Sequence, residues 1–149
     1  THALQPGQER ILFTVTKPLD EPSWREPIVN NYDLSQGKVK DKCVVIINAS
    51  SERYIIGVAN KKRFALAPYE MSAITTDEAE SLLVQVSGSS DKENWARVQK
   101  LFLPVMPDKT HLLFAYAVSP QESARGFKVI RGKLAPDDFR EPIKTRHSR

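Results

Sequence analysis

The sequence predicts an all-β domain, a two-sheet antiparallel β-sandwich of immunoglobulin-like, Greek-key type with about nine strands. Between residues 43 and 86, short runs rich in Val and Ile recur roughly every ten residues, with only turn-forming segments between them. The chain of 149 residues is long enough for one domain, residues 1–149, with a core of its own. A partly open barrel is the alternative architecture.

The first strand is expected over residues 10–16, where side chains alternate between two faces. A long connection containing Pro18, Pro22 and Pro27 follows at residues 17–41, and connections of that length often carry function. Further strands are predicted at residues 43–47, 54–58, 64–66, 71–74, 82–86, 95–103, 111–118 and 127–134.

Two of these predicted strands, residues 43–47 and 112–117, are apolar on both faces, so we expect them to be interior strands of a covered sheet. Residues 127–133 alternate as a half-exposed strand does. Residues 87–94 are expected to form a polar loop. One helical turn is expected at residues 76–81, with Asp77 as its N-cap and Glu80 completing a capping box.

The formal net charge of +4 comes mainly from a basic C-terminal tail at residues 140–149, which holds four Lys and Arg residues against Glu141. The rest of the chain is therefore almost neutral. A nucleic-acid groove needs basic and stacking side chains on the folded surface, and the sequence shows no such arrangement. We expect no nucleic-acid partner, and a basic-tailed binder of nucleic acid or anionic surfaces is kept only as an alternative.

Cysteine content and hydropathy exclude further classes of protein. The single cysteine, Cys43, excludes an internal disulfide and a multi-cysteine zinc site, and its apolar surroundings favour a buried residue. No run approaches the roughly twenty apolar residues of a membrane-spanning helix. A chain that opens at Thr1 suits an exported protein whose leader has been removed, so we expect an extracytoplasmic location, with a trimmed cytosolic chain as the alternative.

The residues with reactive side chains do not form a catalytic pattern. No serine lies in a Gly-x-Ser-x-Gly sequence, and no glycine-rich loop carries the lysine of a phosphate site. The order Cys43, Met71, Met106, His111 does not fit a copper site. His111, at the start of an apolar strand, is expected to be a packed or solvent-edged residue and not a catalytic base. The sequence therefore predicts a non-enzymatic protein without a metal or cofactor.

Four aromatic residues in or beside predicted loops are candidate interaction residues: Trp24, Tyr32, Tyr69 and Trp95. Exposed rings there could stack on sugars, which makes a carbohydrate-binding module one interpretation. The other interpretation is that a sandwich needs aromatic residues in its core and corners. The sequence Asn48-Ala49-Ser50 also matches the N-glycosylation pattern, at a predicted turn.

A short sequence occurs twice. Trp24-Arg25-Glu26-Pro27-Ile28 and Phe139-Arg140-Glu141-Pro142-Ile143 both place Arg-Glu-Pro-Ile after an aromatic residue. Each proline would block pairing within a sheet, so both segments could be extended strips that pin the sandwich or dock on a partner. This interpretation adds Phe139 and Arg140 to the candidate interaction residues, with coincidence as the alternative.

Residues 44–86 resemble small exported β-domains of the immunoglobulin-like class. The resemblance lies in the succession of strands, in the Asn-Ala-Ser turn and in the corner Leu66-Ala67-Pro68-Tyr69-Glu70. The Cys…Trp…Cys spacing of true immunoglobulin domains is missing, so the resemblance is one of architecture. Such folds most often serve in adhesion, scaffolding or surface assembly, which implies a protein-binding module, for example in a surface or pilus-type assembly.

Overall fold

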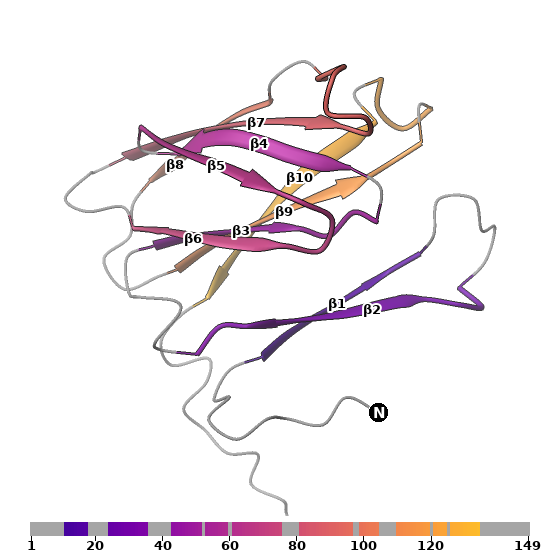
Figure 1. Ribbon diagram of the computed structural model, residues 1–149. Coiled ribbons are helices and arrows are strands. Elements are labelled where there is room, and N and C mark those ends of the chain that lie inside the picture. Colours follow the sequence, from indigo (N-terminus) through magenta and orange to yellow (C-terminus); the bar gives the residue numbers. More distant parts are fainter. Residues whose placement is uncertain are drawn as a thin grey trace, which may run out of the picture.

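The computed structural model confirms the all-β sandwich (Figure 1). It describes residues 11–17, 24–35, 43–51, 53–59, 61–75, 81–96, 99–104, 110–119, 121–124 and 126–134. Within these ranges the chain forms ten strands in one ribbon and two four-stranded sheets. They are β1 (Ile11–Thr16), β2 (Ile28–Asp33), β3 (Cys43–Asn48), β4 (Tyr54–Ala59), β5 (Lys62–Leu66), β6 (Met71–Thr75), β7 (Ser81–Ser89), β8 (Gln99–Pro104), β9 (Thr110–Ala117) and β10 (Phe127–Leu134).

The two sheets have the strand orders β10-β9-β3-β6 and β5-β4-β7-β8. In the first sheet the place beside β3 is taken by β9, which comes late in the chain and runs parallel to β3. All other pairs are antiparallel. The β-sandwich is thus confirmed, with one parallel pair of strands in one of its sheets.

The inward faces of the two sheets enclose the main core, which includes Ile46, Ile55, Val84, Leu113 and Phe127. Each open side of the sandwich is bridged by a basic side chain. Lys62 Nζ on β5 donates a hydrogen bond to Thr75 Oγ1 on β6 at 2.9 Å, and Arg131 on β10 reaches the carbonyl of Phe102 on β8 at 3.4 Å. These bridges join the paired edges of the two sheets.

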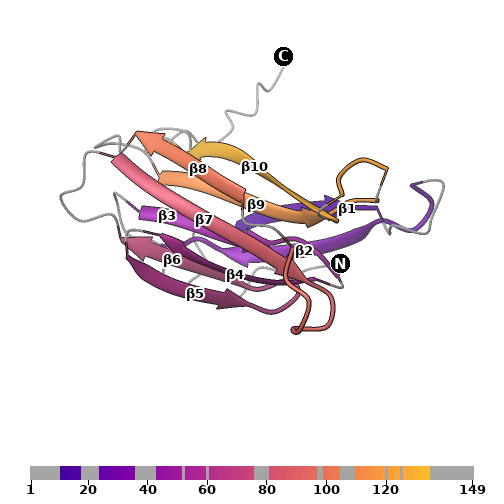
Figure 2. The same ribbon diagram turned by 90° about the horizontal axis from the view of Figure 1, so that it is seen from above.

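The ribbon β1–β2 forms a third layer, on the outer face of the sheet that contains β3 (Figures 1 and 2). Its side chains help to form a second core: Tyr32, Leu34, Cys43, Val45, Ile47, Ala49 and Leu112. Because β3 lies between the two cores, all six of its residues are buried, as its apolar sequence predicts.

The prediction that residues 17–41 form a connection without a strand is wrong, because this segment contains β2. Two other boundaries differ as well. β7 extends to Ser89, so the first three of the eight residues in the predicted loop at residues 87–94 are strand, and β8 begins at Gln99, not at Trp95. Residues 76–80 of the predicted helical turn and the basic tail at residues 140–149 lie outside the described residues.

Candidate functional site

Among the described residues, the hydrophobic packing between the ribbon and the sheet lies at one end of the ribbon. There, Tyr32 is buried, with 4% of its surface exposed, and Leu34 and Leu12 pack beside it against the apolar side chains of β3. The Tyr32 hydroxyl lies 3.5 Å from the carbonyl oxygen of Asn48, and burial raises the pKa of this hydroxyl. Tyr32, predicted as an interaction residue, is thus placed in the core, where it anchors the ribbon.

At the other end the inward face of the ribbon becomes polar. Thr14 and Asn30 face each other across the two strands, and Thr16 pairs with Ile28 one step further on. Asn30 Nδ2 is enclosed without a hydrogen-bond partner among the described residues, and the Thr14 hydroxyl lies close enough to the Tyr32 hydroxyl to lower the pKa of Tyr32. Such polar groups gain little from packing on an apolar sheet, which explains why the second core stops here.

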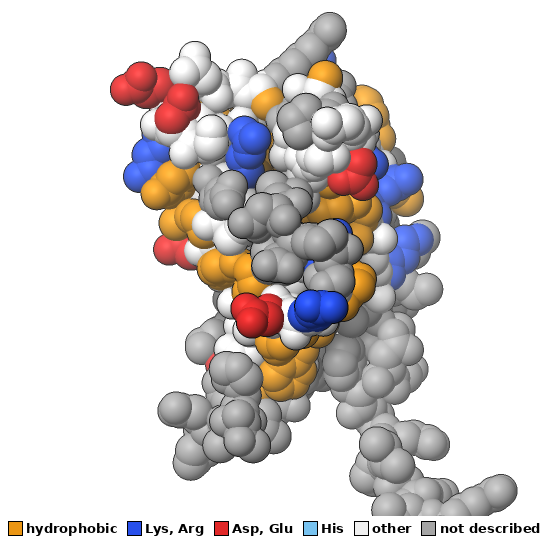
Figure 3. All heavy atoms as spheres, turned by 90° about the vertical axis from the view of Figure 1, so that its right-hand side faces the viewer, with side chains coloured by type: hydrophobic (Ala, Val, Ile, Leu, Met, Phe, Trp, Pro, Cys, Tyr) orange, Lys and Arg blue, Asp and Glu red, His pale blue; other side chains and the backbone are white. Residues whose placement is uncertain are grey.

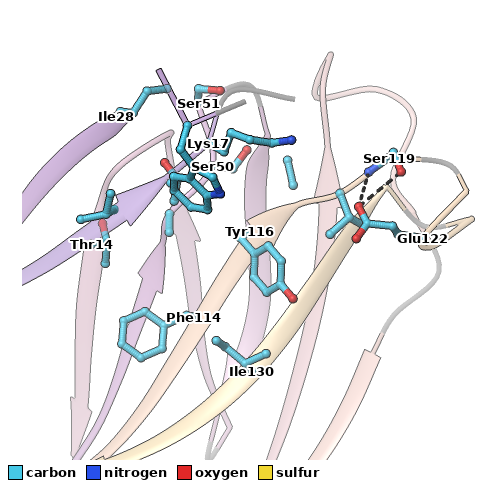
Figure 4. Close-up of a pocket in the computed structure, with 16 residues that line it drawn as sticks. Thr14, Lys17, Ile28, Ser50, Ser51, Phe114, Tyr116, Ser119, Glu122 and Ile130 are labelled. Carbon is cyan, nitrogen blue, oxygen red and sulfur yellow. Dashed lines mark hydrogen bonds between the residues drawn. The ribbon is translucent and has the colours of Figure 1, made fainter. Parts of the chain in front are cut away.

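A groove of about 640 Å³ lies at this polar end, between the ribbon and the outer face of β9 and β10. Trp24, Ile28 and Lys17 line it from the ribbon side, and Phe114 and Ile130 line it from the sheet (Figure 4). Ile130 and Phe114 are directly paired between the two strands. The sheet therefore presents an apolar surface that the ribbon leaves open.

The outward face of the ribbon, in contrast, carries exposed apolar side chains. Phe13, Val15 and Val29 point away from the sandwich, with 48%, 54% and 41% of their surfaces exposed, and Val15 pairs with Val29. In a strand with one buried face the apolar residues normally lie on that face. Here three apolar residues lie outward and two polar ones inward. We call Phe13, Val15 and Val29 the outer ribbon patch.

Several loops gather at the end of the sandwich where the groove opens. The register places the segments after β3, before β4, between β5 and β6, after β7 and after β9 at this end. Figure 3 shows the end face on, with apolar side chains among charged ones. Of these segments, the ones after β3 and after β9 line the groove, through Ser50, Ser51, Ser119 and Glu122.

The aromatic residues predicted for this site have different positions. Trp24 is the most exposed of them, at 62%, and lines the groove. Tyr69 lies in the turn between β5 and β6, in the left-handed region with φ of 64°, and Trp95 lies in the loop after β7, partly buried. Neither lines the groove. Phe139 and Arg140 lie outside the described residues.

The loop after β7 is ordered by Asp91. Its carboxylate accepts hydrogen bonds from Ser89 Oγ, from Asn94 Nδ2 and from the backbone N–H groups of Glu93 and Asn94. These bonds stabilise the ionised form and hold the pKa of Asp91 well below its usual range. The carbonyl of Lys92 accepts the indole N–H of Trp95 at 3.0 Å, so Trp95 is part of the loop structure.

Asn48 also has a structural role. Its side-chain nitrogen donates to the carbonyl oxygens of Arg53 and Ala67 at 2.6 and 2.9 Å, and its Oδ1 accepts from the N–H of Ser50. The residue is completely buried. In the folded protein this nitrogen is therefore not available to the N-glycosylation that the sequence pattern allowed.

The structure places His111 in a buried position at the start of β9, as its sequence context predicts. Its Nε2 has no hydrogen-bond partner. Desolvation lowers the pKa of the imidazole, the charges of Lys133 and Arg131 act in the same direction, and the carbonyl of Pro104 opposes them. The ring is therefore neutral at pH 7.

This burial predicts an acid-sensitive fold. The unfolded chain binds a proton on His111 below a pH of about 6.5, whereas the folded chain resists it. The free energy of unfolding should thus be highest above pH 6.5 and fall as the pH drops from 7.5 to 5.5. Urea unfolding at both pH values would measure this, and His111→Gln should make the curve flatter. An equal slope in the variant would contradict the assignment.

The described residues contain no group of three or more His, Cys, Asp or Glu side chains placed to hold a metal ion. Among them there is also no helix of the length and hydropathy that crossing a membrane requires. No protein-family model matches the chain, and no curated protein or solved structure is detectably similar to it.

Proposed function

We propose that the chain is a non-enzymatic β-sandwich module, immunoglobulin-like in one of its sheets, that binds a protein partner through the outer ribbon patch. The observation that carries this proposal is the reversed polarity of the ribbon, with Phe13, Val15 and Val29 in solvent while Thr14 and Asn30 face the sandwich. Exposed apolar patches framed by polar residues commonly mark interaction surfaces.

The stability of the ribbon gives a second argument. A two-stranded ribbon is marginally stable unless one of its faces is well packed. Here only the Tyr32 end of the inward face is packed, and the groove separates the rest from the sheet. A partner that covers Val15 and Val29 would supply packing that the described residues do not provide. Such a role suits a component of a surface or pilus-type assembly.

Site-specific photocrosslinking in the source cells tests this proposal. A benzophenone amino acid at position 13 should give one defined protein adduct, and Val29→Glu should abolish that adduct because it puts a charge in the patch. The matched control is the same probe at position 100, on the outward face of β8 in the other sheet. Equal adducts at positions 13 and 100, or none at either, would contradict the proposal.

The carbohydrate-binding alternative rests on the exposed ring of Trp24. A glycan array distinguishes it from protein binding, because a sugar site that uses this ring should lose its signal in Trp24→Ala and keep it in Val29→Glu. That result, together with a negative crosslinking experiment, would replace the proposed function by the alternative.

A further inference from the structure

The groove beneath the ribbon has the properties of a small-molecule site. Its volume of about 640 Å³ lies within the range of ligand pockets, which are mostly apolar with a few placed polar groups. One wall is a rigid sheet surface formed by β9 and β10, and the other is the ribbon, which is anchored by Tyr32 outside the groove. The space is therefore built into the fold and is not a gap between loops alone.

The two ends of the groove differ in polarity. Figure 4 shows Phe114 and Ile130 at one end and Lys17, Ser50 and Ser51 at the other. The register agrees, since Phe114 pairs with Ile130 and lies beside Ile47, three residues before Ser50. A ligand that fills this space would meet hydrocarbon at one end and an ammonium and hydroxyl groups at the other.

The charges favour an anionic end group. Lys17 and Glu122 are the two lining residues that carry a full charge at neutral pH. Glu122 Oε2 already accepts hydrogen bonds from the N–H and hydroxyl of Ser119, both at 3.3 Å. Lys17 is exposed at the end of β1, and no carboxylate among the described residues pairs with it. Among the described residues that line the groove, Lys17 is therefore a cation without a carboxylate partner.

We propose that this groove binds a small amphiphile, a hydrocarbon body that ends in a single carboxylate. The body lies against Phe114 and Ile130, and the carboxylate lies at Lys17. This function goes beyond the proposed protein binding, which uses the opposite, outward face of the ribbon. The two sites share Val15, which also lines the groove, whereas Phe13 and Val29 belong to the outer ribbon patch alone, so variants at position 29 can separate them.

Isothermal titration with three probes of equal chain length tests the proposal: dodecanoate, dodecanol and dodecyltrimethylammonium, each below its micelle concentration. Dodecanoate should bind about threefold to fivefold more tightly than dodecanol, the gain of one exposed ion pair, and the cationic probe should bind most weakly. Lys17→Gln should remove the preference for dodecanoate, and Lys17→Arg should keep it.

Ile130→Glu should weaken binding of all three probes by at least about tenfold, since it puts a charge at the apolar end. Ile56→Glu, on the outward face of β4 in the other sheet, is the matched control and should leave binding unchanged. Val29→Glu should also leave it unchanged, whatever it does to protein crosslinking. The proposal is overturned if dodecanoate does not bind, if Lys17→Gln leaves the preference intact, or if Ile130→Glu and Ile56→Glu act alike.

Discussion

Replacing Asn48 with Ala is expected to lower the free energy of unfolding by about 3 kcal/mol, because the change leaves several buried backbone groups without partners. The Asn48 amide joins the end of β3 to the carbonyls of Arg53, just before β4, and Ala67, just after β5. It thereby connects the two sheets at the end where the loops gather. Its backbone N–H also donates to the carbonyl of Glu70 at 2.8 Å, a bond that the variant retains.

Two further variants show whether the amide itself is responsible. Asn48→Asp keeps the size and the acceptor for Ser50 N–H but removes the donor, so it should be at least as destabilising as Asn48→Ala. Ser50→Ala removes the hydroxyl oxygen that accepts a hydrogen bond from the backbone N–H of Arg53 at 2.9 Å, and it should cost about 1 kcal/mol. Urea melts measure all three. A loss below about 1 kcal/mol in Asn48→Ala would contradict the bridging role.

The interior strands could be predicted from sequence because burial on both faces produces an unbroken apolar run. This holds for β3, which packs against the main core on one side and the second core on the other. Which strand would pair with β3 could not be predicted, because β9 lies more than sixty residues away in the chain and runs parallel to it. Local patterns carry no information on such a distant pairing.

β2 was missed because its polarity is unusual. Val29 faces solvent and Asn30 faces the sandwich, so the strand shows no apolar–polar alternation. The spacing of Ile28, Tyr32 and Leu34 on one side was the available signal. β7 was predicted too short for a related reason, since Ser87, Gly88 and Ser89 resemble a loop. A glycine fits this position, because a Cβ would lie 3.0 Å from the Phe127 ring, which is a tight contact.

The sequence does not predict the groove, and only one of the residues that line it is among the predicted interaction residues. Trp24 was selected for its position in a loop, and it does line the groove. Ile130 and Phe114 were assigned to strands, and nothing local showed that their shared face would be left open. That face depends on where the ribbon separates from the sheet, which follows from Thr14 and Asn30. Whether the groove exists thus depends on how the β1–β2 ribbon packs against β9 and β10, which lie far away in the sequence.

Truncation of two neighbouring residues on β9 should give unequal losses of stability. Leu113 is completely buried between the two sheets, whereas Phe114 faces the groove and is only half-buried. Leu113→Ala should lower the free energy of unfolding by about 4 kcal/mol, since it removes a transfer contribution and leaves a cavity. Phe114→Ala removes a larger side chain but should cost only about 1–2 kcal/mol, because water already reaches one side of the ring.

Side-chain size alone would predict the larger loss of stability for Phe114→Ala. The opposite order therefore tests whether the side chains of β9 alternate between the main core and the groove. Val45→Ala on β3 offers a third reference, because Val45 is fully buried but belongs to the second core beneath the ribbon. Its loss should fall between the other two if the Tyr32 end of the ribbon is firmly packed. Urea melts of the three variants give the order, and a greater loss for Phe114→Ala than for Leu113→Ala would mean that the ribbon closes over the groove.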